Sequence, residues 1–151
     1  MEEVQRIEDQ LTRAFEGNAW HGPSVRELLA DMSAERALAK PLATAHSIWE
    51  IVLHIAAWER VVRRRLAGVD VTLSPEEDWP PVQEASEMAW KSAVDSLEQG
   101  HHELRSLIAR LSEAQLQDPV VGRHDSVYHM VHGVIQHDLY HAGQIAILKK
   151  G

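Results

Sequence analysis

The sequence predicts an all-α protein, a four-helix bundle with short extra helices in its connections. Three observations lead to this class. Apolar residues recur at helical spacing in four long segments, no segment alternates in the manner of a strand, and glycine and proline punctuate the intervals. Long helices with one apolar face bury it most completely by packing against one another, which makes a bundle the expected architecture.

The composition is that of an ordinary globular domain. The chain has 151 residues, of which 44% are hydrophobic and 25% charged, so we expect a single domain over residues 1–151. No apolar run approaches the roughly 18 to 20 residues of a membrane span, and the acidic start lacks the pattern of a secretory signal. We therefore expect a cytoplasmic protein with no membrane partner.

Charge and cysteine content exclude several kinds of function. The net charge is -8 with neutral histidines, which argues against nucleic-acid binding. The one basic cluster, Arg60 with residues 63–65, ends a predicted helix, where cations interact favourably with the helix dipole and lie in solvent. The sequence has no cysteine, so disulfides, thiolate ligands and a cysteine nucleophile are excluded.

The first long helix is predicted over residues 3–16, where Val4, Ile7 and Leu11 recur at helical spacing. One or two short helices, capped by Ser24 and Ser33, are expected next.

The second long helix has the clearest start in the chain. Ser47 and Glu50 form a capping box, in which each side chain accepts a hydrogen bond from the other residue's amide. The helix is predicted to end at Gly68. Residues 68–81 are predicted to be an irregular loop, because the prolines at Ser74-Pro75 and in the run 79–81 oppose regular structure.

The third helix is predicted over residues 82–111, with Gly100 weakening it near its middle. A short turn at 112–116 precedes the fourth helix, predicted over residues 126–149. The long connection between the second and third helices allows more than one topology, which the sequence leaves open.

Histidine is the residue type whose number stands out, with ten in the chain, and it is the commonest metal ligand. His137 and His141 lie four residues apart on the fourth helix, so both rings can reach one ion at about 2.0–2.1 Å. Their stripe is largely apolar and is predicted to face inward; it contains Met130, Val134, Gln144 and Leu148. By contrast, His129 and His132 are expected to be solvated or hydrogen-bonded.

His54 is the candidate for a third ligand. It lies in the apolar segment IVLHIAAW, residues 51–58, so its ring is expected inside the molecule. There it would either bond to a backbone carbonyl or Glu50, or face the fourth helix as a ligand. Three inward histidines from two helices would leave coordination positions open for water or substrate.

Four further residues flank this predicted site. Glu50 is a candidate general base or hydrogen-bond acceptor, although it also caps its helix. Gln144 is a candidate for orienting a ligand or substrate, with helix packing as the alternative. Trp58 would either wall the pocket or belong to the core. Asp138, which points about 100° away from His137, is predicted to be a surface or interface charge.

Other kinds of site fail on their requirements. A di-iron carboxylate centre needs two Glu-x-x-His units, and the chain has only the one at Glu98 to His101. The sequence has no glycine-rich loop of the kind that binds the phosphates of a nucleotide. It also has no Gly-x-Ser-x-Gly motif, the turn that presents a catalytic serine in α/β-hydrolases.

Two segments carry a specific resemblance. HSIWEIVLHIAAWE (residues 46–59) and HDLYHAGQI (residues 137–145) resemble the two signatures of the DinB/YfiT-like superfamily of metalloenzymes. In that family a histidine of the second helix joins an HxxxH pair on the fourth; the matching positions are His54, His137 and His141. The resemblance extends over nearly the whole chain in helix order. It implies a four-helix bundle, often a homodimer, that holds nickel, zinc or a similar divalent ion.

The same resemblance implies a metal-dependent enzyme acting on a small molecule. Members of the superfamily include transferases and isomerases that use low-molecular-weight thiols such as bacillithiol or mycothiol, with the metal activating the thiol. A hydrolase using metal-bound water is the enzymatic alternative. A non-catalytic metal-binding or dimerisation module is the alternative from another class.

Overall fold

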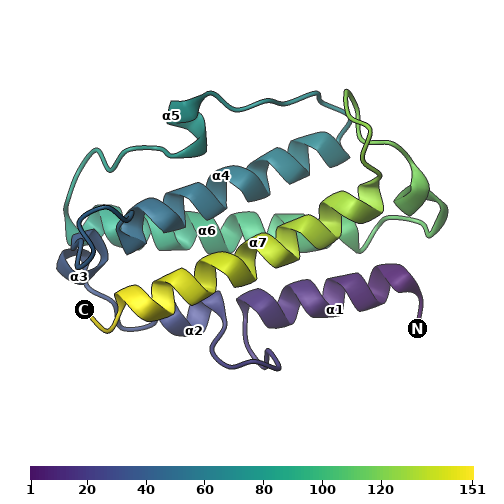
Figure 1. Ribbon diagram of the computed structural model, residues 1–151. Helices are drawn as coiled ribbons and strands as arrows, with labels where there is room; N and C mark the ends of the chain where they lie inside the picture. The colour runs from purple at the N-terminus through teal and green to yellow at the C-terminus, as the bar shows by residue number, and fades with distance from the viewer.

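Four long helices form the bundle in the computed structural model, which describes residues 1–151. They are α1 (Glu3–Phe15), α4 (Ile48–Leu66), α6 (Glu87–Ile108) and α7 (Val127–Leu148). α4 packs against both α6 and α7, and α1 packs against the same two helices (Figure 1). The predicted all-α bundle is confirmed.

The topology, which the sequence left open, follows from the connection between α4 and α6. This connection runs back along the bundle, so α4 and α6 point the same way, whereas α1 and α7 run in the opposite direction (Figure 1). The arrangement places the N-terminus and the C-terminus at opposite ends. It also draws the connecting chain across the outside of α4, which carries His54.

The short helices lie in the connections, as predicted. They are α2 (Val25–Leu29), α3 (Ala34–Leu38), α5 (Pro75–Asp78) and a 3-10 turn at Ala114–Gln117. Ser24 and Ser33 cap α2 and α3, and the capping box at the start of α4 is present, with the Ser47 hydroxyl accepting from the Glu50 amide at 3.1 Å.

Two predictions about local structure were wrong. Residues 68–81 are not wholly irregular, because Ser74 caps α5 and Pro75 occupies its first turn, where a missing N–H costs no hydrogen bond. The third helix does not begin near Val82: Ser86 caps it, its hydroxyl accepting from the Ala89 amide, so α6 starts at Glu87.

Gly100 does not interrupt α6, which runs unbroken through it. The residue is buried against α4, and a Cβ there would lie 2.5 Å from Nη1 of Arg63. The glycine therefore lets the Arg63 side chain cross α6 at close range.

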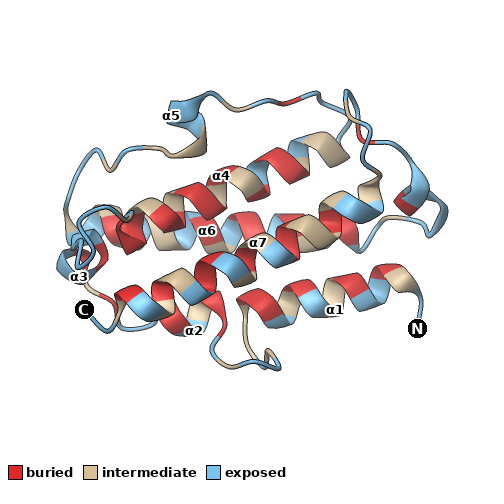
Figure 2. Cartoon of the chain, viewed as in Figure 1, coloured by how far each residue is buried: buried red, intermediate tan, exposed pale blue.

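The inward faces of the four long helices make the core, as the buried stripes in Figure 2 show. Most buried side chains are apolar, but Glu59, His101 and Asp138 are also fully enclosed. No helix combines the length and the apolar character that crossing a membrane would require.

Candidate metal centre

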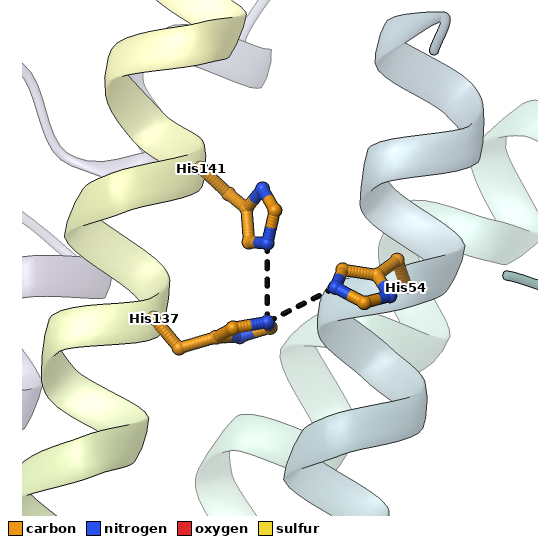
Figure 3. Close-up of side chains that lie close together, drawn as sticks. All are labelled: His54, His137 and His141. Atoms are coloured by element: carbon orange, nitrogen blue, oxygen red, sulfur yellow. Dashed lines mark hydrogen bonds between the residues drawn. The ribbon is translucent and has the colours of Figure 1, made fainter. Parts of the chain in front are cut away.

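Three histidine rings converge between α4 and α7, as Figure 3 shows. The Nε2 atom of His137 lies 3.0 Å from Nε2 of His54 and 3.1 Å from Nε2 of His141. His54 comes from α4 and the other two from α7. The predicted convergence of these three residues is therefore present, and the spacing suits a common ion bound at about 2.0–2.1 Å from each nitrogen.

Two of the rings are held by acceptors on their far side. Nδ1 of His54 donates to the backbone carbonyl of Asp78 at 2.6 Å, and the ring stacks on Trp79 with centroids 3.7 Å apart. Nδ1 of His141 donates to Oε1 of Gln144, also at 2.6 Å. A hydrogen on Nδ1 leaves Nε2 as a lone pair, so both rings present their metal-binding nitrogen to the same point.

The trio of His54, His137 and His141 cannot satisfy all of its ring nitrogens with hydrogen bonds to one another. His54 and His141 both face His137 with lone pairs, and a neutral His137 has one hydrogen to give. If Nε2 carries that hydrogen, Nδ1 of His137 is a buried acceptor with no partner; if Nδ1 carries it, three lone pairs face one another. A cation at the centre would satisfy all three Nε2 atoms together, so these residues fit a metal ion.

The environment of the three imidazoles keeps them neutral, the form that binds a metal ion. Burial lowers the pKa of all three histidines below the usual 6.5, and the pKa of His137 falls to about 3 through burial and the neighbouring imidazoles. Metal binding requires neutral imidazole. The three rings are therefore in the binding form at neutral pH.

The family match extends well beyond these residues. The sequence pattern of the DinB superfamily matches residues 19–145, which span most of the bundle and include all three histidines. The chain belongs to the DinB superfamily. No curated protein and no solved structure matches it.

Two other predicted residues of this DinB chain have clear positions. Gln144 contacts His141 directly, as described above. Glu50 has no hydrogen bond to the three histidines: one carboxylate oxygen accepts from the Ser47 amide at 2.7 Å and the other lies 3.3 Å from Nζ of Lys40. Its capping role is thus visible, while its proposed acid–base role is a prediction.

A cavity of about 280 Å³ reaches His137 from the side of α4 and the loop before α7. Trp58, Val62 and Met130 supply apolar wall, and Arg65 and Arg123 supply positive charge. Nε of Arg65 is buried without a hydrogen-bond partner, and burial together with Arg123 lowers the pKa of this guanidinium. Arg65 was expected to lie in solvent at the helix end; instead it lines the cavity.

Sequence reasoning missed the contribution of the α4–α6 connection. Asp78 and Trp79 lie in the segment expected to be an irregular loop, yet they hold the His54 ring, and Oδ1 of Asp78 also accepts from Nε1 of Trp58 at 2.7 Å. The capping sequence Ser74-Pro75-Glu76-Glu77 is the feature that could have revealed an ordered helix there.

Asp138 is the clearest correction at the level of a single side chain. It was predicted to be a surface or interface charge, but it is 0% exposed and neither carboxylate oxygen has a hydrogen-bond partner. Burial raises its pKa to about 8. The residue points into the core because α7 is enclosed on two sides, by α1 and by α4.

Proposed function

We propose that this chain is a metal-dependent enzyme whose ion is held by His54, His137 and His141. The observation that carries the proposal is the convergence of three Nε2 atoms, two of them fixed as lone pairs by hydrogen bonds from Nδ1. We propose zinc or nickel as the ion, because the resemblance to the superfamily implies one of these, and neutral imidazole ligands suit both.

Catalysis is favoured over a structural role by what surrounds the trio. Only three residues make up the candidate ligand group, whereas structural zinc sites are closed by four protein ligands. A cavity that His137 helps to line adjoins the trio and is large enough for a small molecule. Both features support an open site.

The reaction we propose is transfer of a low-molecular-weight thiol to an electrophile. An ion in this site would stabilise a bound thiol as its thiolate. The thiol releases its proton to solvent, the sulfur forms a bond to an electrophilic carbon, and the leaving group departs with the bonding electron pair. The resemblance to thiol-dependent members of the superfamily favours this chemistry over hydrolysis.

Individual residues are assigned roles on the same basis. Trp58 and Met130 exclude water from the cavity, and the guanidinium groups of Arg65 and Arg123 attract an anionic group of the substrate. Gln144 is a positioning residue that acts through His141. Glu50, which lies outside the hydrogen-bond network of the trio, is proposed as an accessory base that takes up the released proton through solvent.

We also propose that the protein is a cytoplasmic homodimer. Absence of cysteine suits a reducing compartment. The resemblance to the superfamily implies a homodimer, and Tyr140 and Ile147, seven residues apart on α7 and 67% and 65% exposed, are the contacts that we propose for the second copy.

The test uses protein loaded with Co²⁺ and titrated with 2-mercaptoethanol. The proposal predicts a thiolate-to-cobalt charge-transfer absorption in the wild type and in His21→Ala, a variant of an exposed histidine. The absorption should be absent from His141→Ala.

Other outcomes would contradict thiol transfer in distinct ways. Wild-type protein that binds cobalt but gives no band with the thiol, yet hydrolyses 4-nitrophenyl acetate in a His141-dependent manner, would favour the hydrolase. Cobalt binding with neither result would favour a non-catalytic module.

A further inference from the structure

A second group of ligand-type side chains lies in the core, outside the three-histidine site. Glu59 of α4, His101 of α6 and Asp138 of α7 bring one ligand atom each within 4.8 Å of one another. Their exposed fractions are 1%, 0% and 0%. Three different helices therefore direct titratable groups to one enclosed point.

These groups do not satisfy one another. One hydrogen bond lies within the group, at 3.4 Å between Nδ1 of His101 and Oε1 of Glu59. Oε2 of Glu59 and both oxygens of Asp138 have no partner. A buried carboxylate without a partner costs several kcal/mol, so both acids hold protons in the metal-free chain, and a bound cation would replace those protons.

The two carboxyl groups lie close enough to affect each other, because Asp138 contributes to the raised pKa of Glu59. Protons make both acids neutral in the metal-free chain, and a bound cation would take the place of those protons. Arg63 is the nearest compensating cation for Glu59, but its guanidinium is directed to the exposed Glu103, with Nε 3.5 Å from that carboxylate. The acids are therefore spaced around a point and left without a protein cation between them.

The neighbours of His101 fix the orientation of its imidazole ring toward Glu59. The His101 ring stacks on Phe15 with centroids 3.9 Å apart and planes 12° from parallel. Its Nδ1 points at Oε1 of Glu59, and its Nε2 lies 3.6 Å from Oε1 of Glu16, too far for a hydrogen bond. A metal ion bound at Nδ1 would place the ring hydrogen on Nε2, on the side of the Glu16 carboxylate.

We propose that Glu59, His101 and Asp138 bind a second divalent metal ion. Two carboxylates balance the charge of such an ion, and the mixed oxygen and nitrogen donors suit Mn²⁺, Fe²⁺ or Zn²⁺ better than softer ions. The three-histidine site has no carboxylate, so the two sites differ in metal preference. This inference is independent of the proposed thiol chemistry.

The second ion would stabilise the first site through the backbone. Asp138 follows His137 directly on α7, and Glu59 lies five residues after His54 on α4. An ion between these carboxylates would join α4 to α7 directly after His137 and just over one helical turn from His54. Because its ligands are enclosed, it would exchange slowly, whereas the ion at the three histidines adjoins a cavity.

The experiment measures metal content in tag-free protein from cells grown with added manganese and zinc. Wild type should retain about two equivalents per chain after desalting, and Glu59→Gln and His101→Gln about one. Glu98→Gln, the same kind of change elsewhere on α6, should retain the wild-type content. EDTA should remove the wild-type metal in two phases, with the slow phase missing from Glu59→Gln.

A separate measurement isolates the second site. Mn²⁺ should still bind to His141→Ala, so the electron paramagnetic resonance signal of the free aqueous ion should disappear. In the double variant His141→Ala with Glu59→Gln, Mn²⁺ should stay free and the signal should remain. A wild-type content of about one equivalent, unchanged in folded Glu59→Gln, would overturn the second site and leave the first intact. Loss of metal in Glu59→Gln but not in His141→Ala would support the second site and contradict the first.

Discussion

The orientation of the candidate ligands is decided by groups that bind no metal themselves. Asp78 and Gln144 each accept a hydrogen bond from Nδ1 of a histidine, and this leaves Nε2 of His54 and His141 free. His137 has no such acceptor, since its Nδ1 is buried without a partner. Its ring is therefore held by packing and by the other two ligands alone.

Gln144→Leu tests this at the residue scale. Loss of the acceptor frees the His141 ring to choose either hydrogen position and to rotate, so metal affinity should fall roughly 10- to 100-fold. Competition with a fluorescent chelator measures the change. Gln136→Leu, on the exposed side of α7, is the matched control, and equal affinities in the two variants would contradict the role of Gln144.

The three candidate ligands could be picked out from the sequence because each lies in a local sequence pattern. An HxxxH pair on a helix and a histidine inside an apolar run are visible without a structure. The acceptor of His54 was invisible, because it is a backbone carbonyl 24 residues away. Any residue type can supply a carbonyl, so no sequence feature marks it.

At the scale of elements, α5 is the part of the molecule that completes the site. It ends at Asp78 and is followed by Trp79, whose ring stacks between two histidine rings. The ring centroids are 3.6 Å apart for His46 and 3.7 Å apart for His54. The connection thus acts as a wall of the metal centre, although it contributes no candidate ligand.

Trp79→Leu should therefore weaken metal binding without unfolding the bundle. Removing the stacked ring loosens α5 from His54, and we expect a loss of affinity of roughly tenfold. Isothermal titration calorimetry measures it, with circular dichroism to verify helix content. Trp20→Leu, at a tryptophan that is 101% exposed, should bind metal as the wild type does; an equal loss there would show that the effect is not local.

The buried positions of Glu59 and His101 can be read from helix periodicity, whereas Asp138 was wrongly predicted to be a surface or interface charge. Val52, Ile55 and Val62 place Glu59 on a buried stripe of α4, and Leu97 and Leu104 do the same for His101 on α6. A charged residue on an apolar stripe predicts burial with a partner. What periodicity could not give was the register between helices that brings the three together.

At the scale of the whole molecule, enclosed ionisable groups determine how stability depends on pH. Burial lowers the pKa of four histidines, to about 3 for two of them; they are His54, His101, His137 and His141. The unfolded chain protonates these residues below about pH 6.5 and the folded metal-free chain does not. Stability is therefore lost as pH falls below about 6.5.

Glu59 and Asp138 act in the opposite sense. Burial raises the pKa of both carboxyls, that of Asp138 to about 8, so the folded metal-free chain holds protons that the unfolded chain releases above about pH 4 to 4.5. Their contribution is lost as pH rises toward 8. The four histidines and the two carboxyl groups together predict that the metal-free protein is most stable near pH 6.5.

Urea unfolding in EDTA at pH 5, 6.5 and 8 checks this prediction. The free energy of unfolding should decline on both sides, with each group changing the slope by on the order of 1 kcal/mol per pH unit. Glu59→Gln should flatten the alkaline side and steepen the acid side, because the folded chain keeps the Glu59 proton from about pH 4.5 upward. Stability that rises steadily to pH 8 would contradict the burial of the carboxyl pair.

The most direct test of the central claim is an anomalous difference map from crystals of the metal-loaded protein, recorded at the absorption edge of the ion. The account predicts a peak about 2.0–2.1 Å from Nε2 of His54, His137 and His141 alike. A map with no peak among these three nitrogens, from protein shown to contain the metal, would contradict it.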